Sequence, residues 1–180
     1  MEITQAQKDV RQTFLGGFAG QLASSLLWAI SAAAATWHSL RLGGLILVLG
    51  GFFIFPTTQL LLRAMGHAYA LPKGHPMNAL AVQIAFTLPL TMLVVLALAS
   101  LHPAFFYPAM MIALGAHYLP FVFLYGMRMF AVLCGLLVTG GVLIALHLPN
   151  PVSAGAWITA AILLAFSLAG FATVRTEQKA

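Results

Sequence analysis

Six long apolar runs limit what this chain can fold into. Short polar turns separate these runs, which cover residues 14–37, 42–62, 78–100, 105–125, 129–146 and 152–174. A run of about 20 apolar residues makes a helix long enough to cross the hydrocarbon of a bilayer, and such a helix satisfies its own backbone hydrogen bonds. The sequence therefore predicts an all-α polytopic membrane protein, a bundle of six transmembrane helices.

The composition favours one membrane domain. Of the 180 residues, 62% are hydrophobic and 6% are charged, whereas soluble domains carry about 25% charged residues. The segments outside the runs, including the tails at 1–13 and 175–180, are too short to form a second folded unit. We therefore expect a single transmembrane domain over residues 1–180, and we exclude a water-soluble globular protein.

Carboxylates are confined to the two ends of the sequence. The acidic residues are Glu2, Asp9 and Glu177, so the six runs contain none. Chemistry that depends on an aspartate or glutamate inside the membrane, such as a carboxylate proton relay, is therefore excluded. Cys134 is the single cysteine and lies in an apolar run, which leaves no paired-cysteine metal motif. We expect no cofactor.

The basic residues predict the orientation of the bundle. The two tails and the second and fourth turns contain seven of the eight bases: Lys8, Arg11, Arg63, Lys73, Arg128, Arg175 and Lys179. Only Arg41 falls on the other side. Because lysine and arginine accumulate in cytoplasmic loops, both termini are predicted to be cytoplasmic. The bases lie singly and form no patch, so we expect the lipid bilayer as a partner and no nucleic acid.

The N-terminal tail is expected to remain outside the hydrocarbon. Ile3, Val10 and Phe14 would share one face of a helix, which predicts that the tail lies along the membrane interface. A frayed tail is the alternative. The long leader with Glu2 and Asp9 disfavours a cleaved signal peptide.

Polar side chains recur within the runs, in the half nearest the termini. Two stripes follow helical spacing, namely Gln21, Ser24, Ser25 and Trp28 in the first run and Gln83, Thr87 and Thr91 in the third. We expect a cytoplasm-facing polar cavity lined by Gln21, Ser24, Gln59, Gln83, Thr87, His117, Tyr118, Tyr125 and Arg128. The alternative is that these side chains only join helices, each hydrogen bond contributing about 1 kcal/mol.

His117 is the one ionisable side chain deep inside a predicted helix. On helical spacing it shares a face with Tyr125 and Arg128. An intramembrane histidine indicates a functional site, although a neutral histidine bonded to a glutamine or tyrosine is the simpler interpretation. Arg128, like Arg63, lies at a helix end where it can reach lipid phosphate. If the two arginines turned inward instead, the ligand would be an anion.

Two further patterns bear on packing. Prolines at 56, 89 and 120 fall within the runs and predict kinks beside the polar residues. Glycine pairs at 16 and 20, and at 43–44 and 50–51, permit close helix contact within one chain or across a homodimer.

Three histidines lie in turns on the side opposite the termini. His38, His102 and His147 would bind zinc or copper only if their loops met around one ion, and no local spacing enforces this. We expect interfacial histidines and keep this set as a weak metal candidate.

Short motifs point to a family. The segments are Phe14-Leu-Gly-Gly-Phe-Ala-Gly20, Ile54-Phe-Pro56, Phe106-Tyr-Pro-Ala-Met110 and His117-Tyr-Leu-Pro-Phe-Val-Phe-Leu-Tyr-Gly-Met-Arg128. In these segments the chain resembles a family of small bacterial multi-span membrane proteins of unknown function, over most of its length up to Leu146. The resemblance implies a bacterial cytoplasmic membrane and no assigned activity.

Three functions remain open. The first is binding or transport of a small neutral or anionic molecule, or of a lipid. The second is an intramembrane lipid-modifying enzyme with His117 as base and Tyr118 or Tyr125 as acid, although no carboxylate is present to orient the histidine. The third is a structural or accessory bundle without a ligand. The lack of charge in the runs favours binding over acid–base catalysis.

Overall fold

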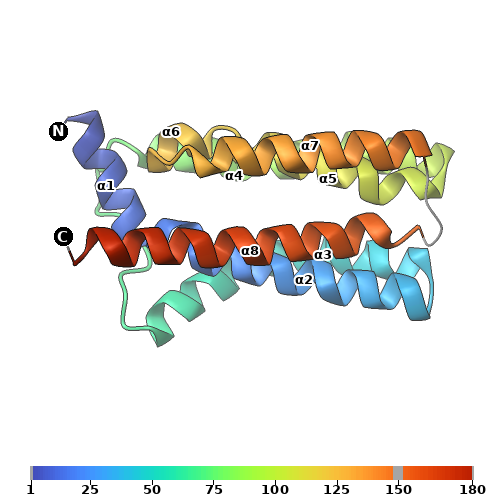
Figure 1. The fold of residues 1–180 in the computed structure, drawn as a ribbon, viewed down its shortest axis with the longest axis horizontal. Coiled ribbons are helices and arrows are strands. Elements are labelled where there is room, and N and C mark those ends of the chain that lie inside the picture. The colour runs from blue at the N-terminus through green and yellow to red at the C-terminus, as the bar shows by residue number, and fades with distance from the viewer. Residues whose placement is uncertain (1, 148–151, 180) are drawn as a thin grey trace.

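The chain folds into a bundle of long helices (Figure 1). The computed structural model describes residues 2–147 and 152–179, and all regular structure in those ranges is helical. The α-helices are α1 (Ile3–Thr13), α2 (Phe18–Trp37), α3 (Leu40–Ala64), α4 (Asn78–Leu101), α5 (Phe106–Tyr118), α6 (Phe121–Tyr125), α7 (Met129–His147) and α8 (Ala154–Glu177). Short 3-10 turns, η1 (Leu15–Gly17) and η2 (Pro103–Phe105), precede α2 and α5.

The six predicted spans are confirmed as helices. Within the described residues, six segments are long and apolar enough to cross a membrane: Leu15–Trp37, Leu40–Ala64, Asn78–Leu101, Pro103–Tyr125, Met129–His147 and Ala154–Glu177. Their ends differ from the predicted ends by up to three residues. The least punctuated boundary, between the fourth and fifth spans, is set by Gly126, whose φ of 64° ends α6. These are the helices of a multi-span membrane protein.

The helices form two layers (Figure 1). The first layer holds α2, α3 and α8, with α2 packed against both of the others; in the second layer α5 packs against α4 and α7. Contacts between the layers are much less extensive and run mainly from α8 to α7 and α5. We call the interface between the two layers the seam. The end of the bundle that carries α1 and the end of α8 is the terminal end, and the opposite end is the loop end.

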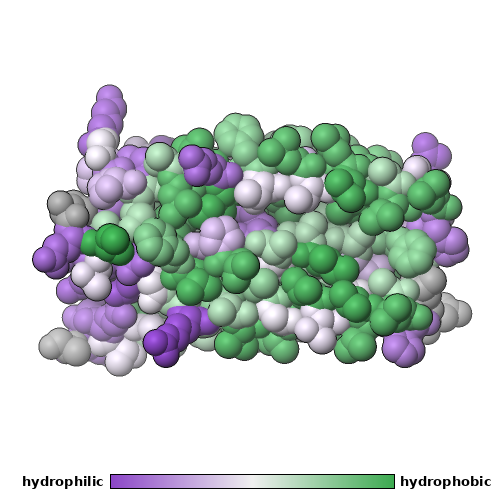
Figure 2. Space-filling model, turned by 90° about the horizontal axis from the view of Figure 1, so that it is seen from above, coloured by the Kyte–Doolittle hydropathy of each residue, from purple (hydrophilic) through white to green (hydrophobic). Residues whose placement is uncertain are grey.

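The outer surface is apolar between two polar ends (Figure 2). Few residues of α3 and α4 are buried, and large apolar side chains such as Phe52, Phe53 and Leu93 are exposed. A water-soluble protein rarely exposes a continuous apolar surface of this kind, whereas a bilayer requires one.

The prolines act in two ways. Pro56 and Pro89 lie inside α3 and α4, as predicted. Pro120 instead separates α5 from α6, so the fourth span is broken rather than kinked, and α6 is a single short turn of helix below the break. The break matters for the site because it fixes where Tyr118 and Tyr125 point.

The N-terminal tail is a helix that lies across the terminal end and bridges the layers (Figure 1). Its inward face buries Ala6 and Val10, whereas Ile3 is 59% exposed. The tail is a helix and not a frayed end, and Val10 packs into the bundle. That the tail lies along the membrane interface stays a prediction.

A tight left-handed turn connects α1 to α2. Leu15, Gly16 and Gly17 have φ values of 50°, 65° and 85°, a region that residues with a Cβ rarely occupy. Gly16 also touches α8, since a Cβ at that position would lie 2.7 Å from the carbonyl oxygen of Gly170. Glycine is required there for both conformation and space.

Candidate polar site in the seam

One face of α2 is turned toward the second layer. Gln21, Ser24 and Trp28 are spaced by three and four residues, which places them on the same side of the helix, and Gly17 directly precedes the first turn. All four are buried. The polar stripe predicted for the first span is therefore an inward-facing stripe.

Three buried tyrosines of the second layer meet this face in order. Tyr107 and Tyr118 belong to α5, and Tyr125 is the last residue of α6. A Cβ at position 17 would lie 3.9 Å from Cζ of Tyr125, and the rings of Trp28 and Tyr107 are 6.2 Å apart. From the terminal end, the neighbours across the seam are Gly17 with Tyr125, Ser24 with Tyr118, and Trp28 with Tyr107.

Gln21 is a buried residue of this face whose amide group has no hydrogen-bond partner in residues 2–147 and 152–179. Its side chain is 2% exposed, and within the described chain neither Oε1 nor Nε2 has a hydrogen-bond partner. A glutamine amide can donate two hydrogen bonds and accept two, and leaving a buried polar group unpaired costs about 1–3 kcal/mol. Along the chain Gln21 lies between Gly17, which neighbours Tyr125, and Ser24, which neighbours Tyr118, so it is level with the part of the seam between these two tyrosines.

Other buried polar side chains of the seam behave differently. The Ser25 hydroxyl donates to the carbonyl of Ala160 at 2.9 Å, and the Ser167 hydroxyl donates to that of Phe18 at 3.1 Å. These two bonds join α2 to α8 inside the first layer. They match the alternative interpretation, in which polar side chains only join neighbouring helices. Gln21 differs because its amide has no hydrogen-bond partner among the described residues.

Aromatic rings wall the site on the side of the second layer. Phe121 stacks on Tyr125 with ring centroids 5.5 Å apart, and Phe130 stacks on Tyr118 at 6.1 Å. Phe121 and Phe130 also contact each other at 5.4 Å. Tyr118 and Tyr125 thus belong to a closely packed aromatic cluster, which fixes the position of their rings.

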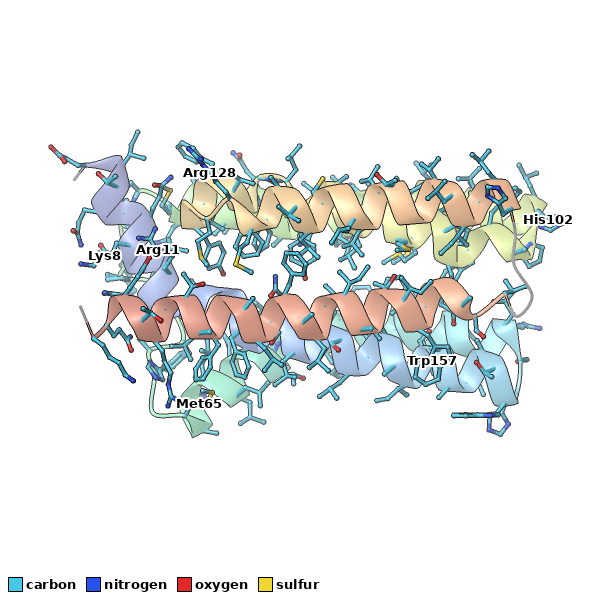
Figure 3. All side chains as sticks on the ribbon, in the orientation of Figure 1. Lys8, Arg11, Met65, His102, Arg128 and Trp157 are labelled. Carbon is cyan, nitrogen blue, oxygen red and sulfur yellow. The ribbon has the colours of Figure 1, made fainter. Side chains whose placement is uncertain are left out.

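Helix α1 closes the terminal end below the site. The Gln7 amide donates to the carbonyl of Phe123 at 2.6 Å, and the Arg11 guanidinium donates to that of Tyr125 at 2.7 Å. These carbonyls belong to the last turn of α6, where a helix leaves its acceptors unpaired. Arg11 also pairs with Glu177 of α8 at 3.2 Å. One side chain thus ties α1 to both layers; Lys8 and Arg11 mark this end in Figure 3.

The structure brings together part of the predicted cavity lining. Gln21, Ser24, Tyr118 and Tyr125 meet in the seam, and all are buried. Gln59 is half-buried on α3. Gln83 is exposed on α4, which packs against α5 within its own layer and thus lies away from the seam.

Arg128 also lies away from the seam. The shared helical face predicted for His117, Tyr125 and Arg128 is wrong, because α5 ends at Tyr118 and Gly126 ends α6. The Arg128 side chain is exposed and points away from the space between the layers (Figure 3).

His117 and Thr87 form a pair inside the second layer. The Thr87 hydroxyl donates to the carbonyl of Ile84 at 2.8 Å, so its oxygen is free to accept from Nδ1 of His117, also at 2.8 Å. This arrangement places the histidine proton on Nδ1. The pair fastens α4 to α5, while the next residue, Tyr118, faces the seam.

The three histidines of the loop end do not form a metal site. Nδ1 of His147 donates to the carbonyl of Leu143 at 2.8 Å, and His102 packs on Phe105. Among the residues that the structure describes, no three histidine, cysteine, aspartate or glutamate side chains lie close enough to share an ion. The reason is that His38 ends a helix of the first layer, whereas His102 and His147 end helices of the second.

The sequence interpretation missed the residues that close the site. Arg11 was considered only as a topology signal and Glu177 only as a carboxylate outside the runs, and Gln7 was not singled out. The glycine pair at 16 and 17 could have indicated them, because it ends one helix and allows the chain to turn, so that α1 packs across the end of the bundle. The contact of Tyr107 with Ser31 was missed because it joins residues 76 positions apart.

Comparison with known proteins identifies a family and no activity. A family model described as a family of unknown function, DUF7010, matches residues 3–173. No curated protein and no solved structure matches the chain. The family match confirms the resemblance found in the sequence motifs.

Proposed function

We propose that this chain, which belongs to the DUF7010 family of unknown function, binds a small uncharged polar molecule in the seam between its two helical layers. The observation that carries the proposal is the buried and unpartnered amide of Gln21. A bound molecule with both a donor and an acceptor would satisfy this amide, and the nearby hydroxyls of Ser24 and Tyr118 would add further hydrogen bonds.

The arrangement of charge favours an uncharged ligand over an anion. Arg63, in the last turn of α3, lies over the ring of Tyr69 in the following loop, 3.9 Å from its centroid. Arg128 is exposed, and Arg11 is already paired with Glu177. No free cation therefore faces Gln21 from the described residues, and a buried anion without one would be strongly disfavoured.

The two other functions have less support. An enzyme with His117 as base would need the histidine at the site, but its Nδ1 bonds Thr87 on the far side of α5. A purely structural bundle accounts for Ser25 and Ser167, which bond neighbouring carbonyls. A purely structural role does not account for Gln21, whose amide is buried without a hydrogen bond to the part of the chain that the structure describes and therefore destabilises the fold.

The proposed setting is a bacterial cytoplasmic membrane, with the terminal end toward the cytoplasm. Seven of the eight basic residues are on the terminal side in sequence, and only Arg41 is on the other. The positive-inside rule then gives cytoplasmic termini. With this orientation the site lies in the inner half of the membrane, beneath α1.

Native mass spectrometry of the purified protein tests the proposal. Wild type, Gln21→Leu and the matched control Gln83→Leu are compared, since Gln83 is an exposed glutamine outside the seam. We expect a small-molecule adduct on wild type and on the control, and its loss from Gln21→Leu. Identical spectra from all three proteins, or an adduct that Gln21→Leu retains, would overturn the proposal.

A further inference from the structure

Polar groups continue along the seam beyond the candidate site. On α2, Ser24 neighbours Tyr118 and Ser31 bonds Tyr107, both of the second layer, and Gln21 lies one turn before Ser24. The positions from Gln21 to Ser31 span 10 residues, or about 15 Å at 1.5 Å per residue, against a hydrocarbon core of about 30 Å. Polar groups therefore face the second layer beyond the Gln21 site, toward the loop end.

The polar series ends in a junction near the loop end. The Ser31 hydroxyl donates to the carbonyl of Gly43 on α3 at 2.8 Å and lies 2.8 Å from the hydroxyl of Tyr107 on α5. Because the Ser31 hydroxyl donates its proton to the Gly43 carbonyl, the Tyr107 hydroxyl is the donor toward Ser31, whose Oγ and carbonyl oxygen lie 2.8 and 3.2 Å away. Ser31 and Tyr107 are both 0% exposed. The junction joins the two layers and closes the seam; we call it the loop-end lock.

A second junction closes the opposite end. Arg11 bonds the carbonyl of Tyr125 in the second layer and Glu177 in the first, and Gln7 adds a bond to Phe123. We call these contacts the terminal-end lock. The left-handed turn at Leu15–Gly17 connects this lock to α2, and α1 also packs on the bundle through the buried side chains of Ala6 and Val10.

Between the two locks the layers are joined loosely. Helices within a layer contact one another extensively, whereas contacts between layers run mainly from α8 to α7 and α5. Two well-packed bodies with a weaker interface move as units when one of the bonds between them breaks. Releasing one lock would open its own end of the seam while the other lock holds the far end.

We infer that the seam is a route across the membrane and that the protein carries its uncharged polar ligand along it, with the two locks opening in alternation. This inference rests on the proposed function, because the ligand site at Gln21 lies between the locks. The one carboxylate within the six spans is Glu177, the last residue of α8, which is paired with Arg11, and His117 lies outside the seam. The transport is therefore expected to run down the gradient of the ligand, with no coupled proton.

Cysteine accessibility tests the route without knowledge of the ligand. In a Cys134→Ala background, Ser24→Cys is the reporter in the seam and Leu26→Cys is the matched control on the same helix, 56% exposed on the lipid-facing surface. The probe is MTSET, a membrane-impermeant cationic thiol reagent, added to one side of sealed vesicles. Lys73→Cys and Arg41→Cys, both at exposed positions, report the sidedness of each preparation.

Two variants release the locks one at a time. We expect Arg11→Ala to raise the labelling rate of Ser24→Cys about tenfold from the terminal side, and Tyr107→Phe to raise it about tenfold from the loop side. Leu26→Cys should stay unlabelled in both. If Tyr107→Phe fails to fold, as judged by gel filtration, Ser31→Ala replaces it. This variant removes the bond between the two hydroxyls but leaves the 3.2 Å bond from Tyr107 to the Ser31 carbonyl, so a smaller rise is expected.

The outcomes separate the inference from the proposed function. Labelling that rises from the terminal side alone would show a pocket with one entrance, which overturns the route and leaves the binding site standing. Mass spectra without any adduct that depends on Gln21 would instead overturn the binding site. Labelling unchanged by both variants would overturn the two locks and the route together.

Discussion

Arg11 donates a hydrogen bond to the carbonyl oxygen of Tyr125 at 2.7 Å, across 114 positions of sequence. The same guanidinium pairs with Glu177 at 3.2 Å. A helix outside the spans is thereby fastened to both layers at the end where the candidate site lies. The bond to Tyr125 satisfies a carbonyl that the end of α6 would otherwise leave unpaired.

Loss of Arg11 should release α1 from the bundle. Hydrogen bonds to charged groups contribute about 1.5–3 kcal/mol. We therefore expect Arg11→Ala to speed amide hydrogen exchange over residues 3–13 by about tenfold or more. Hydrogen-exchange mass spectrometry measures this, with Lys8→Ala as the control because Lys8 is exposed on the same helix. Glu177→Gln should have a smaller effect, since exposed ion pairs contribute about 0–1 kcal/mol. Equal exchange in Arg11→Ala and wild type would contradict the contact.

Two glycine-to-alanine substitutions should have opposite consequences. Gly16 has a φ of 65°, and its Cβ would lie 2.7 Å from the carbonyl oxygen of Gly170, so Gly16→Ala should destabilise the protein by about 2 kcal/mol or more. Gly51 lies inside α3 with nothing within 4 Å of the added atom, so Gly51→Ala should be neutral or stabilise it by up to about 1 kcal/mol. Unfolding in detergent with increasing SDS ranks the two variants. A Gly16→Ala protein as stable as Gly51→Ala would disprove the close approach of η1 and α8.

The Tyr107–Ser31 bond should be measurable as a coupling energy. Interhelical hydrogen bonds in membrane proteins contribute about 0.6 kcal/mol on average and up to about 1.7. Because both side chains are fully buried, we expect about 1 kcal/mol of coupling from Tyr107→Phe, Ser31→Ala and the double variant. The SDS unfolding assay supplies the four stabilities. Additive effects of the two substitutions would mean that the hydroxyls do not interact.

The orientation gives a separate prediction. If the terminal end is cytoplasmic, a cysteine at position 102 should react with an impermeant maleimide only from the outside of intact cells. His102 is exposed at the loop end, so the substitution should not disturb packing. Labelling of this cysteine only in inside-out vesicles would reverse the orientation.

The sequence predicted the spans well because hydropathy is a local property. Each helix is long enough for its own residues to reveal it, and the i, i+3, i+4 spacing of Gln21, Ser24 and Ser25 correctly identified one inward face of α2. Tyr118 and Tyr125 were also placed correctly at the depth of Gln21, because depth follows from position along a helix.

The partners of each helix could not be predicted in the same way. Gln83 and Thr87 lie on one stripe of α4, but α4 packs against α5 alone, so Thr87 finds His117 while Gln83 is exposed. Which helices become neighbours depends on the whole chain and not on spacing within one run. Arg128 was misplaced for a local reason, because the left-handed Gly126 ends the helix that was assumed to continue.

The composition of the first layer has a consequence for how the protein is made. This layer combines α2 and α3 with α8, which is synthesised after all the helices of the second layer, whereas the second layer is built from consecutive helices. The polar face of α2 therefore enters the membrane before the helix that accepts the hydrogen bonds of Ser25 has been synthesised. The second layer can assemble while the nascent chain grows, and the first must wait until synthesis reaches α8.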